Sequence, residues 1–236
     1  MRLTAAIAKI AKYAAGPAGD SAEVVERPLG GLSVMVVDGQ GSGRAAKTLS
    51  AALAGKATAM INDGARDGAV IRAVHDWLFA QKNGKVSASI CILSVDTQAE
   101  TLVVGRSGNC PALVLMPESQ IIFADNCHPL GFYRYSRPMV DQLPLMSGTA
   151  AISFSDGITG AGKSFGLQKT MEDWQQAILA MYQSSIDPAW LAETILETAI
   201  KLDGGRPRDD MTVAVVAVQD EASDGIRRLR IEYPLR

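Results

Sequence analysis

The feature that most limits how this chain can fold is the order of its strand-like and helix-like segments. Strand patterns come first, two helical patterns follow, several short strands come next, and a second helical pair precedes another apolar strand. A doubly wound parallel sheet needs strands and helices that alternate one by one, and this sequence lacks that order. We therefore predict an α+β fold: a four-layer α/β/β/α sandwich, in which two antiparallel β-sheets are flanked by helix pairs.

The helical segments stand out by the spacing of their apolar residues. Leu49 and Leu53 lie one turn apart in an alanine-rich stretch, and a later stretch places Val70 and Val74 on one face. Pro188 suits a first helical turn, because the N–H that it lacks is not needed there. These patterns predict helices over residues 42–61, 65–81, 171–182 and 188–202.

Short apolar runs bounded by turn residues predict the strands. The run LSVMVV at residues 32–37 is apolar throughout, as is typical of a strand covered on both faces. Residues 3–12 alternate enough for a strand, and a helix also fits them. The other predicted strands cover residues 22–27, 87–95, 101–106, 112–116, 120–124, 150–154, 211–218 and 226–233.

Composition limits the classes of partner. Neither an internal repeat nor a low-complexity linker divides the 236 residues, so we predict a single domain, residues 1–236. Hydrophobic residues make up 47% of the chain, which is enough for a sizeable core. The net charge of -2 argues against nucleic acid as a partner and provides no polybasic anchor for a membrane surface.

The cysteines and the N-terminal stretch indicate the cellular compartment in which the protein is expected. Cys91, Cys110 and Cys127 are widely spaced and form no CxxC pair, which argues against a zinc site built on thiolates and against a disulfide framework. Lys9 and Lys12 interrupt the apolar N-terminal stretch, so it does not match a secretory signal. No window approaches the length of about 18 apolar residues that a membrane helix needs. These features predict a cytoplasmic protein.

Four aspartates share one kind of position, the end or the start of an apolar strand. Asp38 and Asp156 each end a strand pattern and precede a glycine, while Asp20 and Asp209 lie just before strands. Carboxylates delivered to one rim of a sheet repel one another unless cations neutralise them. Oxygen ligands without His or Cys favour magnesium, manganese or calcium. The alternative is that these aspartates only cap turns and helices, and their spacing alone leaves both interpretations open.

The residues around the aspartates resemble, in order, the motifs of the PPM family of metal-dependent serine/threonine phosphatases, and more closely its SpoIIE-like bacterial branch. A small-residue turn, GRSGNCP at residues 105–111, also resembles that branch. The resemblance is collinear over a motif core of residues 19–218. The four motifs are GDS at 19–21, VDGQGSG at 37–43, SDGIT at 155–159 and DDMT at 209–212.

The resemblance implies a site with two divalent cations, Mn2+ or Mg2+. By it, Asp38 bridges both metals, the carbonyl of Gly39 and the carboxylate of Asp20 hold one, and Asp156 and Asp209 hold the other. Asp38, Asp156 and Asp209 are then the catalytic residues. A further implication is that the neighbouring Asp210 is a supporting polar residue rather than a ligand.

The same resemblance implies the reaction. A hydroxide bridging the two metals attacks the phosphorus of a phosphoserine or phosphothreonine in line, without a covalent phosphoenzyme. The implied substrate is a phosphorylated regulatory protein, and members of this branch act on STAS-domain antagonists of anti-sigma factors. A non-catalytic scaffold of the same fold is a different class of function, and the four intact aspartates argue against it.

Some residues depart from the family pattern or have no assigned role in it. Gln40 stands where classical members carry a histidine thought to protonate the leaving group, so the general acid is unassigned. Arg44 and Arg106 are candidates for the phosphate-clamping arginine, although a solvated surface position is the plainer prediction for each. His75 is predicted to be a packing residue, and His128 a surface-loop residue.

Two segments carry further hypotheses. Residues 157–164 match the GxxxxGK[ST] pattern of a nucleotide-binding P-loop. Gly166 follows Lys163 and Ser164 closely and disfavours the helix that a P-loop needs at that point, so nucleotide binding is kept only as an alternative. Residues 129–142 mix proline, glycine, tyrosine and arginine, and we predict a surface segment that could regulate the site by ordering and disordering.

Overall fold

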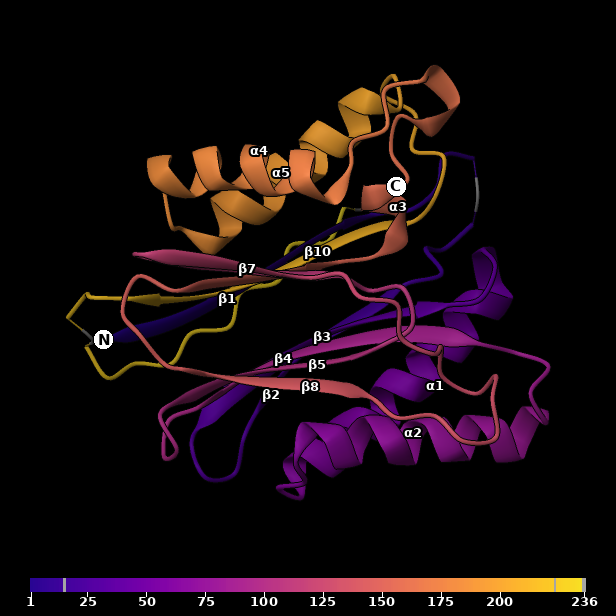
Figure 1. The fold of residues 1–236 in the computed structure, drawn as a ribbon, viewed down its shortest axis with the longest axis horizontal. Helices are drawn as coiled ribbons and strands as arrows, with labels where there is room; N and C mark the ends of the chain where they lie inside the picture. Colours follow the sequence, from indigo (N-terminus) through magenta and orange to yellow (C-terminus); the bar gives the residue numbers. More distant parts are fainter. Residues whose placement is uncertain (15, 223, 235–236) are drawn as a thin grey trace.

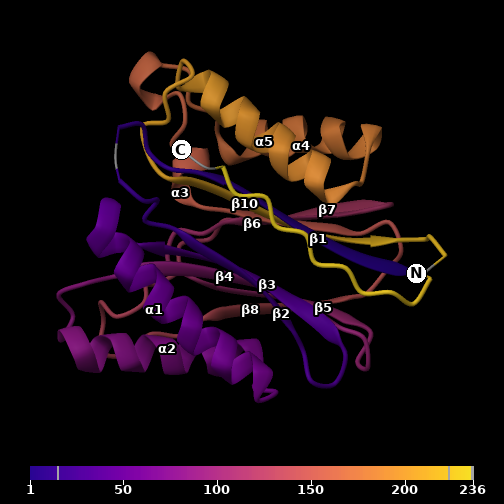
Figure 2. The same cartoon turned by 180° about the vertical axis from the view of Figure 1, so that it is seen from behind.

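The computed structural model describes residues 1–14, 16–222 and 224–234 of the chain. Two stacked β-sheets form the centre of the molecule, and a pair of helices covers the outer face of each sheet (Figures 1 and 2). Within these residues, all the strand pairings in both sheets are antiparallel. The predicted α+β fold, a four-layer α/β/β/α sandwich, is confirmed.

The first sheet brings the two ends of the chain together. β1 (Arg2–Ile10) pairs along its whole length with β10 (Met211–Gln219), so the N-terminal segment is a strand and not a helix. Helices α4 (Met171–Ser184) and α5 (Pro188–Leu202) pack on the outer face of this sheet around the buried Trp174. The strand order is β1, β10, β9 (Ala150–Phe154), β6 (Ala112–Met116) and β7 (Ser119–Phe123).

The second sheet carries the predicted apolar run, which is interrupted only by Ser33. β3 (Gly31–Gly39) pairs on both sides, and helices α1 (Gly43–Asn62) and α2 (Asp67–Lys82) cover the outer face. These helices differ from the predicted ranges only at their ends. The strand order is β2 (Ser21–Glu26), β3, β4 (Ala88–Asp96), β5 (Thr101–Ser107) and β8 (Met139–Pro144).

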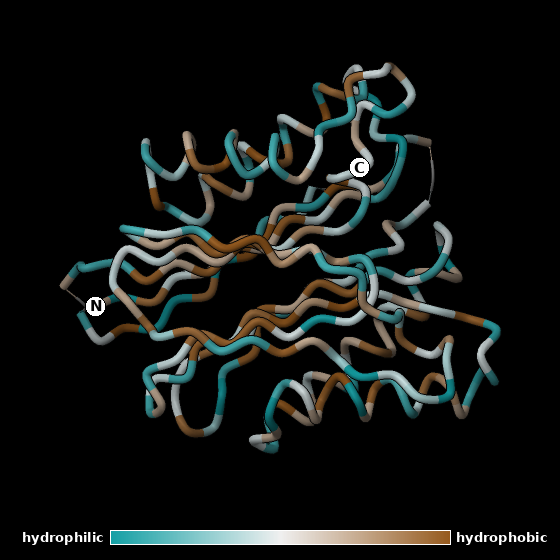
Figure 3. The backbone as a smooth tube through the Cα atoms, in the orientation of Figure 1, coloured by the Kyte–Doolittle hydropathy of each residue, from teal (hydrophilic) through white to brown (hydrophobic). Residues whose placement is uncertain are grey.

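Burial on both faces explains why residues 34–37 of β3 are all apolar. Val34 and Val36 face the layer between the sheets, whereas Met35 and Val37 face the layer under α1 and α2. Full burial of one such side chain contributes about 1.5–3 kcal/mol, so neither face of the strand can be polar without loss of stability. Figure 3 shows the same pattern along the facing sheets, where the backbone is mostly coloured as hydrophobic.

The helices pair one buried face with one solvated face. In α1, Leu53, Ala57 and Ile61 are buried, while Ala51 and Lys56 on the other side are exposed. In the described part of the chain, no helix combines the length and apolarity needed to cross a bilayer.

Two segments differ from the prediction. β8 was not predicted, because its polar residues hide the alternation and its pairing with β5 is a tertiary contact. The strand predicted over residues 226–233 is wrong: Leu229 is 78% exposed and Tyr233 is 84% exposed, and these residues pair with no sheet in the described structure. Apolar residues in a strand-like pattern do not form a strand without a sheet edge to join.

Candidate metal centre

One open cavity of about 410 Å³ collects the carboxylates that the sequence singled out. It lies at the end of the sandwich where α1 begins and where the short helix α3 (Asp156–Thr159) lies, on the right in Figure 1. The aspartates come from both sheets, so the cavity bridges the two halves of the molecule. Its acidic lining residues are Asp20, Asp38, Asp156, Asp209 and Asp210.

Asp38 reaches the cavity from the C-terminal end of β3, where it is the last residue but one. The next residue, Gly39, is buried and still pairs with Ala88 of β4. A Cβ atom on Gly39 would lie 2.5 Å from the carbonyl oxygen of Ala46, which is closer than real Cβ contacts allow. Glycine is therefore required here because helix α1 packs directly on the end of the strand that presents Asp38.

Asp210 holds the loop that presents Asp20. Its two carboxylate oxygens accept hydrogen bonds from the backbone N–H of Lys12 at 2.8 Å and of Gly19 at 2.7 Å. Asp20 itself is 1% exposed, and its Oδ2 accepts a 2.7 Å hydrogen bond from the hydroxyl of Thr212. The role of Asp210 as a supporting residue thus has a direct structural counterpart.

Asp156 and Asp209 come from neighbouring strands of the first sheet. Asp156 is the first residue of α3, directly after β9, and Asp209 lies just before β10. The backbone N–H of Asp210 donates to Asp209 Oδ1 at 2.9 Å. Gly157 packs against the backbone of this turn, since a Cβ there would lie 2.1 Å from the carbonyl oxygen of Asp210.

Burial and mutual repulsion raise the pKa values of the clustered carboxyls. The pKa of Asp38 rises from 3.8 to about 9, mainly through burial and then through the charges of Asp20, Asp156 and Asp209. Burial also raises the pKa of Asp20 to about 6, although hydrogen bonds from Thr212 and another hydroxyl oppose the rise. Burial, and next the charge of Asp209, raises the pKa of Asp156. A cluster with such pKa values favours protons or cations.

The donor set suits hard divalent cations, because carboxylate oxygens are the ligands that Mg2+ and Mn2+ prefer. In the described residues, however, no three His, Cys, Asp or Glu side chains are grouped closely enough to hold an ion. The reason lies in their present partners: Asp38 is hydrogen-bonded to Asp156, and Asp20 is turned toward Thr212. The chain gathers the donors in one cavity, and metal binding requires that they exchange these partners for the ion.

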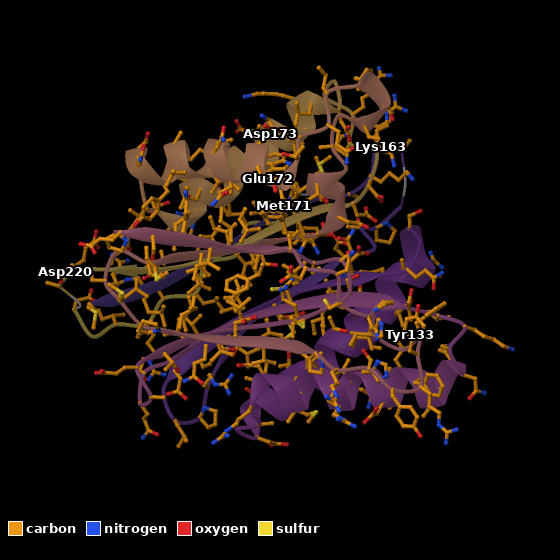
Figure 4. All side chains as sticks on the ribbon, viewed as in Figure 1. Tyr133, Lys163, Met171, Glu172, Asp173 and Asp220 are labelled. Atoms are coloured by element: carbon orange, nitrogen blue, oxygen red, sulfur yellow. The ribbon has the colours of Figure 1, made fainter. Side chains whose placement is uncertain are left out.

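The P-loop alternative does not match the local structure. The only helix at Lys163 in the described chain is a single 3-10 turn, Lys163–Phe165, which ends at Gly166 with a φ of 68°. The N–H of Gly162 donates to Asp203 Oδ1 at 2.8 Å, so this amide serves an internal carboxylate and not a phosphate. Figure 4 shows Lys163 on the α4–α5 side of the molecule.

The two arginine candidates differ. Arg44 is exposed in the first turn of α1, as expected of a solvated residue. The surface position predicted for Arg106 is wrong: this residue is 1% exposed, in the layer between the sheets. It occupies the inward-facing position after Leu102 and Val104 in β5, so strand alternation sends it inward.

Gln40 and the two histidines have structural roles. Gln40 lines the cavity, and its Oε1 accepts a 2.8 Å hydrogen bond from the N–H of Ser87, which ties the end of β3 to the start of β4. His75 is buried and accepts from the N–H of Gly131 at 3.1 Å, so it is a packing residue. His128 is exposed in a loop, as predicted, and its ring lies 4.5 Å from that of Tyr133.

Several residues at the cavity were not found from the sequence. Lys12, Ser87 and Ser89 line it, and the side chain of Asn109 forms a hydrogen bond that lowers the pKa of Asp156. Lys47 donates to the backbone carbonyl of Asp20 at 2.9 Å. Only Asn109 carried a signal, because it lies within the turn at residues 105–111; the others have no motif and are placed by folding alone.

The sequence of this chain is similar to that of a known protein family. The family described as Stage II sporulation protein E (SpoIIE) matches residues 28–219. Stage II sporulation protein E of Priestia megaterium is 22% identical over 213 residues, which cover 90% of this chain and 36% of that protein. The corresponding protein of Bacillus subtilis is 21% identical, and the match covers 92% of this chain and 26% of that protein. The chain thus spans about a third or less of the length of these curated relatives.

Solved structures share the fold. The PP2C phosphatase domain of SpoIIE from Bacillus subtilis, solved with a fragment of its regulatory domain, superposes with a TM-score of 0.77 at 22% identity. That match covers 92% of this chain and 64% of the other. RsbX in complex with magnesium superposes with a TM-score of 0.65 at 17% identity, covering 91% of this chain and 94% of the other.

Proposed function

The chain belongs to the SpoIIE family, and from that premise we propose that it is a metal-dependent protein serine/threonine phosphatase. Its substrates are phosphoserine or phosphothreonine residues on a regulatory protein. Within that class we propose a STAS-domain antagonist of an anti-sigma factor, on the strength of the resemblance to the SpoIIE-like branch.

One observation carries this proposal: four strand ends deliver Asp20, Asp38, Asp156 and Asp209 into a single open cavity. Burial, and then the charges of Asp20, Asp156 and Asp209, raise the pKa of Asp38 to about 9, so the arrangement weakens the fold when no cation is bound. Such a cluster is expected where cations neutralise it, and phosphate transfer is a reaction that clustered cations accelerate.

We assign the ligands by the family motifs. Asp38 would be a ligand of both cations, Asp20 and the carbonyl of Gly39 would help to hold one, and Asp156 and Asp209 would help to hold the other. Bound Mn2+ or Mg2+ would activate a water for in-line attack on phosphorus and offset the charge of the phosphate oxygens. The magnesium of the RsbX complex supports this class of metal.

The other residues around the cavity position these ligands and attract the substrate. Asp210 fixes the loop before Asp20, and Lys47 holds the Asp20 carbonyl, so that loop is braced from two sides. Lys12 lines the cavity and brings a positive charge to its rim, where it favours an incoming phosphate. The Asn109 side chain, hydrogen-bonded to Asp156, opposes the rise in the pKa of that carboxyl.

The test is hydrolysis of an aryl phosphate and of a phosphoserine peptide by protein stripped with a chelator and then given Mn2+. We expect activity only with the metal, and a loss of about 100-fold or more in kcat for Asp38→Asn, because that change removes charge that acts on the transition state. Asp63→Asn, at the exposed C-terminal cap of α1, is the matched control and should retain activity. Circular dichroism should show both variants folded.

The remaining alternatives make different predictions in the same experiment. A scaffold of this fold would bind Mn2+ or a partner without hydrolysing either substrate. Retained activity in Asp38→Asn would remove the bridging role assigned to this carboxylate.

A further inference from the structure

Arg106 is a buried cation in the layer between the two sheets. It lies in β5, opposite Cys91 of β4 and Met139 of β8. The residue is 1% exposed, and its guanidinium carbon lies 5.9 Å from the centre of the Phe123 ring. A guanidinium remains charged at all physiological pH values, so the charge itself is buried.

Two of the three nitrogens of this guanidinium lack a hydrogen-bond partner among the described residues. Its Nε and Nη2 atoms are buried, and no described residue accepts a hydrogen bond from them. Arg27, which directly follows β2, shows the usual arrangement: it donates to Asp67 Oδ1 at 3.1 Å and to the carbonyl of Ala65 at 2.9 Å. The contrast matters because an uncompensated buried charge destabilises a fold far more than a paired one.

Arg106 faces a second cavity of about 220 Å³, distinct from the one that holds the four aspartates. Residues 108–111 form one wall of it and residues 124–127 form the other. Asn109 and Asn126 line the cavity, and the thiol of Cys127 in one wall donates to the carbonyl of Gly108 in the other at 3.1 Å, which links the two walls. The cavity thus combines a fixed cation, a lining that includes two asparagines, and enough volume for a small anion.

We propose that this cavity, the Arg106 pocket, is a binding site for an oxyanion of the phosphate or carboxylate class. The Nε–H and Nη2–H, which are buried and donate to no described residue, form the planar fork that would receive two oxygens of such a group. An anion there would supply both the missing charge and the missing hydrogen-bond acceptors. The site is separate from the one that holds the scissile phosphate next to the four aspartates.

The Arg106 pocket adjoins the metal centre through one residue. Asn109 lines the pocket, its backbone N–H donates to Ser89 Oγ at 2.9 Å, and its side chain is bonded to Asp156. Ser89 and Asp156 both line the larger cavity. An anion held by Arg106 therefore lies on the other side of the turn from the metal centre, where it can steady Asn109 against Asp156.

Two sources can supply this anion: free phosphate released by the reaction, and a carboxylate side chain of the protein substrate near its phosphorylated residue. Both sources rest on the proposed function, whereas anion binding itself does not. Asp125 is exposed on the same cavity wall and is the rival occupant, because its own carboxylate could turn toward Arg106.

The decisive experiment follows the Nε–H resonance of Arg106 in the metal-free full chain by NMR, with inorganic phosphate and then acetate as probes. We expect this resonance to shift saturably with phosphate, and the melting temperature to rise with phosphate concentration because the anion binds only the folded state. Arg106→Met should weaken phosphate binding about tenfold or more, the factor expected for loss of a charge-assisted hydrogen bond. Arg44→Met, which removes an exposed arginine, should leave it unchanged.

Two variants distinguish the possible results of the phosphate-binding experiment. Met in place of Arg106 suits the apolar layer, so Arg106→Met should fold and should lose the melting-temperature response to phosphate. Asp125→Asn should strengthen phosphate binding if the pocket is open to external anions. A resonance of Arg106 that neither probe moves, in wild type and in Asp125→Asn alike, overturns the proposal.

The two sources are told apart by competition. A peptide that carries acidic residues but no phosphate should displace inorganic phosphate from Arg106 if substrate carboxylates occupy the pocket, and should fail to do so if released phosphate is the occupant. Because these measurements need neither metal nor turnover, a failure of the phosphatase proposal would leave their result intact.

Discussion

The hydroxyl of Thr212 donates a 2.7 Å hydrogen bond to Asp20 Oδ2, across 192 positions of the chain. Thr212 lies in β10 of the first sheet, and Asp20 lies just before β2 of the second. The bond therefore joins the two sheets at the metal end of the sandwich. It also lowers the pKa of Asp20, because it favours the ionised carboxylate that a cation needs.

Replacing Thr212 with valine tests this connection. Thr212→Val keeps the shape and removes the donor, so we expect a loss of about 1 kcal/mol in the free energy of unfolding. Without that bond the pKa of Asp20 rises further, and protons compete better with the metal at neutral pH. Titration of Mn2+ followed by calorimetry should show weaker binding in Thr212→Val, and Thr212→Ser, which keeps the hydroxyl, should restore most of it.

Protons and metal compete for the carboxyl cluster, which sets a pH dependence. The folded-state pKa values of Asp38, about 9, and of Asp20, about 6, both lie above the ordinary value of 3.8. At pH values between 3.8 and those raised pKa values, the folded state holds protons that the unfolded state has released. The free energy of unfolding of the metal-free protein therefore falls as pH rises.

Melting temperatures measured across that pH window, with and without Mn2+, check whether stability falls or rises with pH. We expect the metal-free protein to melt at lower temperature near pH 9 than near pH 6, and Mn2+ to stabilise it more at the higher pH, because ligands must be deprotonated to bind. Asp38→Asn should flatten most of the metal-free dependence. A metal-free melting temperature that increases across the window would contradict the raised pKa values.

Gly39 and Gly55 form a matched pair for the packing of α1 on β3. A Cβ on Gly39 would lie 2.5 Å from the Ala46 carbonyl oxygen, whereas a Cβ on Gly55 would meet nothing within 4 Å. Gly39→Ala should destabilise the fold by about 1–3 kcal/mol through overpacking. Gly55→Ala, within α1, should stabilise it by roughly 0.5–1 kcal/mol. Urea denaturation measures both, and equal effects would refute the close approach of helix and strand.

Lys163→Ala addresses nucleotide binding. Lys163 is the first residue of a short 3-10 turn and not of a long helix, so we expect phosphatase activity and melting temperature to stay essentially unchanged. The protein should also show no melting shift with ATP and Mg2+. A shift that disappears in Lys163→Ala would revive the P-loop interpretation.

The sequence alone determined the layers and most of the elements. The apolar run of β3 indicated burial on two faces, and the helical periodicity around Leu53 and Val74 located α1 and α2, because these patterns are local consequences of which face is buried. The strand-end positions of Asp38 and Asp156 likewise followed from local pattern. Their assembly into one cavity was anticipated only with the help of family motifs.

Tertiary structure decided what local pattern could not. β8 exists because β5 offers it an edge, and residues 226–233 form no strand because they join no edge. Arg106 looked like a surface residue, yet strand alternation turns it into the layer between the sheets. The raised pKa of Asp38 comes first from its burial and then from charges on three other segments. Burial and electrostatic repulsion depend on which distant residues meet, and that information is not carried by any single stretch of the chain.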